Sequence, residues 1–229
     1  MLSTQTTHRL RSFVRRSGRR TLAQERAYET LWPTCGLTLE QGVLNIEATF
    51  NRCAPTFLEI GFGTGQSLLA VASLHPEKNW LGVETHRPGL GALMLGIELE
   101  QLTNLRAFNA DVIDVLEQVI PANSLDGVQI FFPDPWQKRR HHARRLVQPA
   151  FLTLLATRVK AGGSLHLATD WADYAVHMQQ VLSAHPDWVS IHPLTVSVPR
   201  SPYRPIITKF ERRALSDGRE IVEFQYQKR

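Results

Sequence analysis

Residues 56–66 of the chain are Thr-Phe-Leu-Glu-Ile-Gly-Phe-Gly-Thr-Gly-Gln, and this stretch carries the clearest indication of the fold. The apolar run Thr56–Ile60 predicts a buried strand, and the helical spacing of apolar residues in Gln66–Leu74 predicts a helix. The loop between them contains three glycines, Gly61, Gly63 and Gly65. A strand, a glycine loop and a helix in this order bring backbone N–H groups close to a nucleotide-like ligand.

The next four predicted strands each end close to an acidic residue. The strands are residues 80–83, 104–108, 127–132 and 164–168, and the acids are Glu84, Asp111, Asp134 and Asp170. Because ligand sites of open α/β sheets lie at the carboxyl ends of the strands, we expect these acids on one shared rim. For Asp111 and Asp170 a helix N-cap is an alternative role, since a predicted helix follows each of them.

Glu59, directly before the glycine loop, distinguishes two candidate ligands. Dinucleotide sites favour Gly-x-Gly-x-x-Gly, whereas this loop has Gly-x-Gly-x-Gly. A carboxylate here would repel a pyrophosphate but attract a cation. S-adenosylmethionine has a ribose, an ammonium and a sulfonium and no phosphate, so Glu59 favours it over NAD. Glu84 is then placed to accept from both ribose hydroxyls, and Asp111 from the adenine amino group. A tight turn in a domain without a nucleotide remains an alternative.

Residues 130–145 are Ile-Phe-Phe-Pro-Asp-Pro-Trp-Gln-Lys-Arg-Arg-His-His-Ala-Arg-Arg, the most distinctive stretch of the chain. Phe132 and Asp134 each precede a proline, so we expect extended, stiff backbone at both. Trp136 offers a stacking surface, and five Lys or Arg and two His follow within residues 138–145. This combination indicates a site for a flat base attached to phosphates. The alternative is a simple turn followed by a solvated charged face.

Composition limits the class of protein. The length of 229 residues suits one domain with an arm, and the net charge of +5 favours nucleic acid over a membrane as the partner. Cys35 and Cys53 show no metal-ligand spacing and the histidines form no metal set, so we expect no metal and a reducing, intracellular setting. No apolar run is long enough to span a bilayer.

Residues 1–30 are expected to form a basic N-terminal arm, and residues 31–229 a single catalytic domain. The arginines of the arm are Arg9, Arg11, Arg15, Arg16, Arg19 and Arg20. Such a block is often disordered until it meets an anion. A solubilising tail is the alternative.

Several motifs, in order over nearly the whole chain, resemble those of one family. They are residues 58–63, residues 82–86, residues 104–106 with Asp111, residues 131–136 with the basic stretch after them, residues 168–171 and residues 208–211. Together they resemble the bacterial tRNA (guanine-N7-)-methyltransferases. The resemblance implies a Rossmann-like class I methyltransferase fold, α/β, with a mostly parallel seven-stranded sheet and helices on both faces.

The resemblance also implies the activity and the site residues. The methyl group of S-adenosylmethionine would pass to N7 of a tRNA guanosine, at position 46 in the variable loop. The implied cofactor contacts are Glu59, Glu84, Asp111 and Asp134, with the glycine loop. The implied substrate contacts are Lys138, Asp170, Thr208, Lys209, Phe210 and Glu211, and RNA would touch Arg140, His141, His142, Arg144 and Arg145. Asp134 is the expected catalytic residue. We expect a cytoplasmic enzyme without membrane contact or an obligate protein partner.

Two departures and two rival hypotheses accompany the resemblance. Gln137 stands where His is frequent in the family and Cys35 where an aromatic is common, so the residue beside Trp136 that helps to hold the base stays open. One rival is a non-catalytic RNA-binding protein with a relic methyltransferase fold, which predicts a broken cofactor rim. The other is a transferase acting on another base or a protein amide. The basic tail and the lack of a Pro-Pro pair favour guanine N7.

Overall fold

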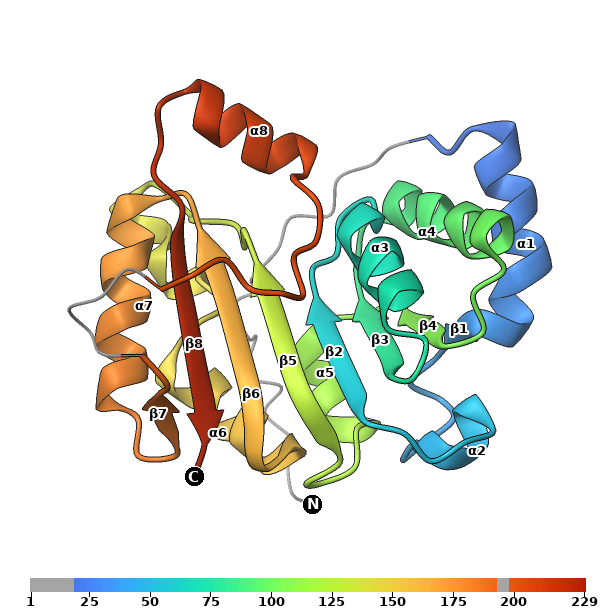
Figure 1. Cartoon of the computed structure of the whole chain (residues 1–229), viewed down its shortest axis with the longest axis horizontal. Helices are drawn as coiled ribbons and strands as arrows, with labels where there is room; N and C mark the ends of the chain where they lie inside the picture. Colours follow the sequence, from blue (N-terminus) through green and yellow to red (C-terminus); the bar gives the residue numbers. More distant parts are fainter. Residues whose placement is uncertain (1–18, 193–197) are drawn as a thin grey trace, which may run out of the picture.

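A computed structural model describes residues 19–192 and 198–229 and places them around one eight-stranded sheet (Figure 1). The strand order is β1-β4-β3-β2-β5-β6-β8-β7. Strands β1 to β6 pair in parallel, and β8 is antiparallel to both of its neighbours. Arg9, Arg11, Arg15 and Arg16 of the expected arm lie outside the described residues.

The strands and helices follow each other in near alternation. The strands are β1 Gly36–Leu37, β2 Thr56–Ile60, β3 Asn79–Val83, β4 Leu105–Phe108, β5 Leu125–Phe131, β6 Val159–Thr169, β7 Trp188–Ser190 and β8 Val222–Lys228. The helices are α1 Leu22–Cys35, α2 Ile46–Phe50, α3 Gln66–Leu74, α4 Arg87–Glu100, α5 Val112–Gln118, the 3-10 helix η1 Arg139–Arg144, α6 Pro149–Arg158, α7 Ala172–Ala184 and α8 Lys209–Ser216.

The expected seven strands are present, and an eighth corrects the expectation. β1 has only two residues and pairs with β4 at the edge of the sheet. A strand this short has no alternation that a sequence pattern could reveal. Without it, the order is β4-β3-β2-β5-β6-β8-β7, a parallel sheet whose last two strands form the antiparallel edge.

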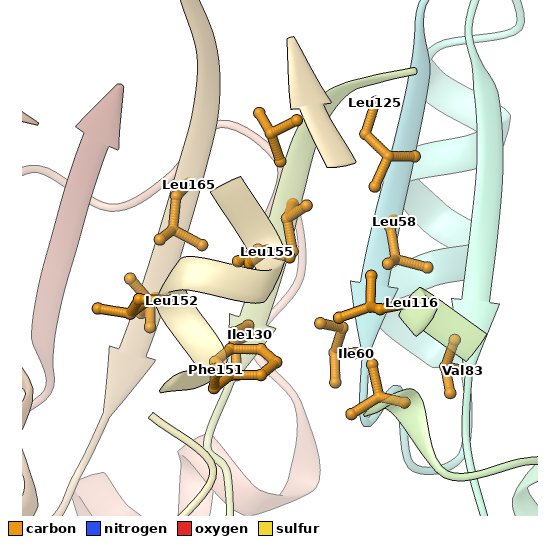
Figure 2. Packing of buried hydrophobic residues seen from close by; sticks show 14 of the residues in the cluster. Leu58, Ile60, Val83, Leu116, Leu125, Ile130, Phe151, Leu152, Leu155 and Leu165 are labelled. Atoms are coloured by element: carbon orange, nitrogen blue, oxygen red, sulfur yellow. The ribbon is translucent and has the colours of Figure 1, made fainter. Parts of the chain in front are cut away.

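Helices cover both faces of the sheet and give two cores. Helices α5, α6 and α7 share one cluster with β2, β3, β5 and β6, and Figure 2 shows Leu58 and Ile60 of this cluster close to Leu116 of α5. Helices α3 and α4 pack on the other face around Phe57 and Trp80, with α1 outside α4. The parallel strands β2 and β3 are buried along their whole length, as expected for strands covered on both faces.

The N-terminal boundary differs from the expectation. Residues 22–35 form one helix whose N-cap, Thr21, makes a capping box with Gln24. Ala27 is fully buried, and Arg26 donates to Glu98 of α4 at 2.9 Å. The boundary expected between residues 30 and 31 therefore falls inside α1, which packs against α4.

The glycines of α4 are explained by close packing. A Cβ at Gly89 would lie 1.9 Å from the carbonyl oxygen of Gly63, and one at Gly96 would lie 2.2 Å from Leu69. The helix thus starts directly against the glycine loop.

The sequence pattern predicts a helix over residues 146–159 that Gly162 and Gly163 end, but in the structure neither glycine ends a helix. Helix α6 ends at Arg158 and β6 begins at Val159, so that both glycines belong to the strand. Gly162 has φ +78°, and a Cβ at Gly163 would lie 2.5 Å from Val159. A glycine pair here allows an irregular start of the strand opposite Asp126, where the register of β5 and β6 shifts.

Residues 198–207, here called the strap, cross the face of the sheet that α3 covers elsewhere (Figure 1). The prolines of residues 193–205 predicted a surface excursion, and residues 193–197 lie outside the described residues. The prediction is wrong for Ser201 and Arg204, which are each 2% exposed. Tyr203 packs on Phe57 with ring centroids 5.1 Å apart, so the strap substitutes for a covering helix.

Candidate active site

A cavity of about 190 Å³ opens at the carboxyl ends of β2, β3, β4 and β5. Its walls are residues 60–61, 83–85 and 131–134 together with Ala110, Val112 and Leu146. Gly61, Glu84 and Asp134 therefore share one rim, as predicted from the strand ends. Asp111 lies between two of the lining residues.

The glycine loop adopts backbone angles that favour glycine. Gly61, Gly63 and Gly65 have φ of +76°, +60° and +79°, which residues with a side chain rarely adopt. A Cβ at Gly61 or Gly63 would meet no atom within 4 Å. Glycine is required there by the backbone angle, and its lack of a side chain leaves open space above the strand ends.

Glu84 connects the loop to the end of β3. Its Oε2 accepts from the backbone N–H of Gly63 at 2.9 Å. Its Oε1 accepts from the N–H groups of Thr85 at 2.7 Å and His86 at 3.0 Å. Three backbone donors orient this carboxylate in the cavity wall, and its contact with a ribose remains a prediction.

Glu59 is a buried carboxyl group beneath the loop. It is 3% exposed, and its Oε2 has no hydrogen-bond partner among the described residues. Burial, reinforced by the negative charge of Glu84, raises the pKa of Glu59 to about 8. Glu59 is not one of the residues that line the cavity, but it directly precedes the lining residues Ile60 and Gly61. A positive charge close to its unpaired oxygen would stabilise the ionised form.

Gln129, next to Glu59 in the sheet, is a buried polar residue that the sequence analysis missed. It pairs in register with Glu59 across β2 and β5 and is 1% exposed. Neither its Oε1 nor its Nε2 has a partner among the residues described, which is rare for buried amides. The available signal was a polar residue within the otherwise apolar run 127–132.

Asp111 caps α5, the alternative that the sequence left open. Its Oδ1 accepts from the N–H of Ile113 at 3.0 Å. The cap orients the carboxylate toward the helix N-terminus beside Ala110 and Val112. A contact with adenine is compatible with this position and stays a prediction.

The loop after β5 is bent rather than extended. Phe132 has φ +51° and Trp136 has φ +46°, so the expected extended backbone before Pro133 is wrong. Side-chain-bearing residues in this region cost about 1–3 kcal/mol each and persist only where the surroundings hold them. Here the N–H of Phe132 donates to Ala168 at 2.8 Å, and Arg145 Nε donates to Pro135 at 2.9 Å. The bend places Asp134 on the rim with an exposed side chain.

Arg145 is a structural residue, which corrects its expected role in RNA contact. Its side chain is 1% exposed and forms an ion pair with Asp173 of α7. Its guanidinium lies 4.9 Å from the ring centroid of Tyr174. Because the Pro135 carbonyl, Asp173 and Tyr174 surround it, Arg145 holds the bent loop to α7 and is not available to a phosphate.

The rest of the basic stretch lies at the surface around Trp136. Lys138 and Arg140 are exposed, and the guanidinium of Arg144 lies 4.9 Å from the Trp136 ring centroid. His141 packs edge-on against the same ring at 5.9 Å, and partial burial followed by nearby cationic charge lowers its pKa. His142 lies 3.1 Å from Arg145. Most of this stretch thus forms a cationic surface beside Asp134.

Asp170 and residues 208–211 lie outside the cavity wall. Asp170 does not cap α7, whose N-cap is Trp171; it accepts from Arg219, a partner that the sequence analysis missed. Thr208 caps α8 by accepting from the N–H of Glu211 at 3.3 Å. Lys209 and Phe210 are exposed, whereas Glu211 is 2% exposed.

Two further observations concern the class of protein. Across residues 19–192 and 198–229, no group of three or more His, Cys, Asp or Glu side chains could hold a metal ion. No helix in the described part of the chain is both long and apolar enough to cross a membrane.

Solved structures show the class of fold. The aminoglycoside resistance methyltransferase NpmB1 has a TM-score of 0.56 at 15% identity, covering 84% of this chain and 94% of its own. The 16S rRNA methyltransferase KamB has a TM-score of 0.55 at 14% identity, covering 82% and 95%. The chain therefore has the Rossmann-like methyltransferase fold that the sequence predicted.

Sequence comparison shows the family. The family described as "putative methyltransferase" matches residues 53–224. The tRNA (guanine-N(7)-)-methyltransferase of Idiomarina loihiensis is 49% identical over 95% of this chain and 88% of its own. That of Alkalilimnicola ehrlichii is 50% identical over 96% and 93%. The chain belongs to the tRNA (guanine-N(7)-)-methyltransferase family, which confirms the resemblance.

Proposed function

We propose that this enzyme transfers the methyl group of S-adenosylmethionine to N7 of a guanosine in tRNA and leaves N7-methylguanosine. The observation that carries the proposal is the position of Asp134 on the cavity rim beside an exposed cationic surface. We place the modified guanosine at position 46 of the variable loop and the enzyme in the cytoplasm, as expected from its family.

The cavity fits a cationic cofactor with a ribose. Glu84 presents an oriented carboxylate in the cavity wall, and the loop leaves open space over Gly61 and Gly63. Glu59, next to the lining residue Ile60, has an unpaired buried oxygen. Among the described residues that line the cavity, none is Lys or Arg, so a pyrophosphate would find no cationic partner there. We assign Glu59 to the ammonium group, Glu84 to the ribose and Asp111 to the adenine. The bound cofactor supplies an electrophilic methyl group.

The reaction requires orientation and charge stabilisation from the protein. Guanine N7 carries a lone pair and no proton, so in-line attack on a sulfonium methyl group needs no general base. The methylated base becomes positively charged, and a fixed carboxylate close to it stabilises that charge. We assign this role to Asp134, which also accepts from guanine N1–H and the exocyclic amino group and so selects guanine.

The cationic surface around Trp136 is assigned to the RNA backbone. Lys138, Arg140 and Arg144 are placed to contact phosphates, and His141 and His142 add to the same surface. Lys209 and Phe210, exposed at the start of α8, and Asp170 are assigned to the tRNA near the modified base. Electrostatic contacts of this kind make binding depend on salt.

The test is methyl transfer from labelled S-adenosylmethionine to tRNA that lacks the modification, followed by nucleoside analysis. We expect N7-methylguanosine only in tRNAs with a guanosine in the variable loop. A different methylated nucleoside would assign another acceptor atom. Cofactor binding without transfer to any tRNA would assign another substrate, and lack of cofactor binding would favour an RNA-binding protein without activity.

A further inference from the structure

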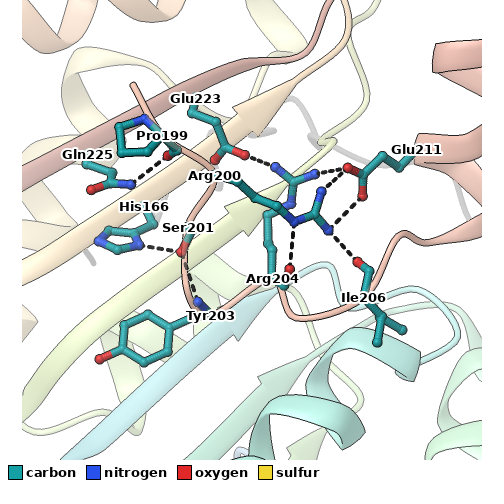
Figure 3. Close-up of polar contacts among 10 residues, drawn as sticks. All are labelled: His166, Pro199, Arg200, Ser201, Tyr203, Arg204, Ile206, Glu211, Glu223 and Gln225. Carbon is teal, nitrogen blue, oxygen red and sulfur yellow. Dashed lines mark hydrogen bonds and ion pairs between the residues drawn. The ribbon is translucent and has the colours of Figure 1, made fainter. Parts of the chain in front are cut away.

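A buried network of ion pairs connects the strap, α8 and β8 (Figure 3). Arg204 of the strap, Glu211 of α8 and Glu223 of β8 are 2%, 2% and 8% exposed. Arg204 forms ion pairs with both carboxylates, at 2.8 Å for Glu211. Because charges removed from water are costly unless paired, this arrangement strongly restricts where α8 can start.

Glu211 is held by two arginines. Arg200 forms a second ion pair with it and donates to the backbone carbonyls of Arg204, at 2.8 Å, and Ile206, at 2.5 Å. Burial opposes ionisation of Glu211, but hydrogen bonds and charges from Arg200 and Arg204 outweigh it and lower the pKa. Glu211 is thus ionised, and its ion pairs hold the start of α8, where Lys209 and Phe210 are exposed.

Arg204 also contacts the wall of the cavity. Its guanidinium lies 4.9 Å from the ring centroid of Phe132 and 5.5 Å from that of Phe131. Both aromatic residues line the cavity, and Phe132 has the unfavourable φ of +51° directly before Pro133 and Asp134. A cation over an aromatic face is attractive, and strongly so when water is excluded.

We propose that Arg204 is a positioning residue that fixes the start of α8 relative to residues 131–134 of the cavity wall. The planar guanidinium of Arg204 contacts Glu211, Glu223 and the two aromatic rings at once. A lysine has a single ammonium group and cannot make all of these contacts. The inference rests on the proposed function, because the two parts it joins are the expected acceptor contact and the expected catalytic loop. In-line transfer tolerates little misplacement, and an error of about 1 Å costs on the order of 10²-fold in rate.

A different result is expected if the ion pairs only stabilise the fold. In that case substitutions would lower the folded fraction and leave the turnover of folded enzyme unchanged. If Glu211 instead touched the tRNA directly and Arg204 acted separately, the losses from the two substitutions would multiply.

The experiment compares Arg204→Lys, Glu211→Gln and the double variant. Turnover and the KM for tRNA are measured with saturating S-adenosylmethionine, and each rate is divided by the folded fraction from circular dichroism. The matched control is Lys160→Met, which breaks an ion pair with Asp126, 2.8 Å in length, at the opposite end of β5 and β6.

We expect each single substitution to lower the turnover of folded enzyme by about tenfold or more. We expect the double variant to lie within about twofold of the worse single variant, because the residues act as one unit. The control should lose thermal stability and keep its turnover.

Unchanged turnover in folded Arg204→Lys, or losses that multiply in the double variant, would overturn the inference. If Arg204→Lys does not fold, Phe132→Leu combined with Glu211→Gln gives the same test of additivity without changing the arginine. The unsubstituted enzyme distinguishes a failure of the proposed function from a failure of the role assigned to Arg204. Lack of transfer by it overturns the proposed function, whereas an active enzyme with unaffected variants overturns only the role of Arg204.

Discussion

The two sides of the cavity rim are held by different kinds of contact. On the side of β2 and β3, the glycine loop is fixed by the hydrogen bond that the Gly63 N–H donates to Glu84 and by the start of α4 against Gly63. On the side of β5, β6 and β8, the loop around Asp134 and the start of α8 are fixed by ion pairs between distant segments. The sequence separations are similar, 21 residues for Gly63 and Glu84 and 19 for Arg204 and Glu223, so the two sides differ in the kind of contact.

This difference matches what each side is proposed to bind. The cofactor is small and always the same, so a site made by consecutive strand ends and backbone groups suffices. The acceptor is a large folded RNA that has to be placed against Asp134 from several elements at once. We therefore expect substitutions on the β2 and β3 side to act on cofactor affinity, and those on the other side to act on turnover or tRNA binding.

The largest expected effect is on turnover, from Asp134→Asn. The amide keeps the shape of the side chain but cannot stabilise the positive charge of the methylated base. We expect turnover to fall by roughly 10²-fold or more, while tRNA binding is retained. Steady-state kinetics and a tRNA binding assay measure the two quantities. Asp187→Asn, before β7 and away from the cavity, is the control, and near-normal turnover of Asp134→Asn would contradict the assigned role.

Glu59→Gln tests the proposed cofactor side of the rim. Its effect on the stability of the protein is expected to depend on pH. The pKa of Glu59 is raised from 4.5 to about 8 in the folded protein, so the folded state holds its proton more tightly than the unfolded state. Without cofactor, the stability of the unsubstituted protein therefore falls as pH rises from about 4.5 to 8, by on the order of a few kcal/mol. The glutamine variant lacks this loss, so its advantage in Tm should grow over that interval.

The same variant should bind S-adenosylmethionine at least about tenfold more weakly, because it cannot pair with the ammonium group. Isothermal titration in buffers with different ionisation enthalpies adds a direct check. Binding to the unsubstituted protein near pH 7 should release protons as Glu59 ionises, and binding to Glu59→Gln should release fewer. Equal affinity and equal proton release in both proteins would remove Glu59 from the cofactor site.

Gly89→Ala tests the contact between α4 and the glycine loop. The new Cβ would lie 1.9 Å from the carbonyl oxygen of Gly63, so the loop or the helix has to move. We expect a loss of about 1–3 kcal/mol in stability and weaker cofactor binding with unchanged KM for tRNA. Gly91→Ala is the control, because its nearest neighbour is the flexible side chain of Arg20 at 2.6 Å. If both variants behave alike, the contact with Gly63 is unimportant.

The smallest effects are expected from two neighbouring arginines, Arg144 and Arg145, which should change different properties of the enzyme. Arg145→Ala should lower stability by about 1–3 kcal/mol, since it leaves the Pro135 carbonyl without its donor. Arg144→Ala should leave Tm nearly unchanged, raise the KM for tRNA and reduce the slope of log affinity against log salt by about one unit. Thermal melts and binding titrations at several salt concentrations distinguish them. An unchanged slope for Arg144→Ala would make it part of a solvated face only.

Sequence alone predicted which strand ends form the cavity rim on the side of β2 and β3. The strand, glycine loop and helix of residues 56–74, and the rim formed by Gly61, Glu84 and Asp134, follow from patterns within single segments. Local patterns work there because a parallel sheet brings successive strand ends together whatever the details of its packing. The N-cap role of Asp111 was one of two alternatives, indicated by the helix predicted directly after it. The same alternative is wrong for Asp170, because Trp171 is the N-cap of α7.

The other side was decided by the tertiary structure. Arg145 and Glu211 appear in the sequence as members of a basic run and a motif, and only packing shows that both are buried ion-pair partners. Arg204 and Arg219 gave no signal, because the partners of a long, flexible side chain are set by which segments meet in space. The sequence by itself therefore determined the fold class and the strand ends that meet at the cavity. The arrangement that holds the acceptor loop arises from contacts between segments that no local pattern encodes.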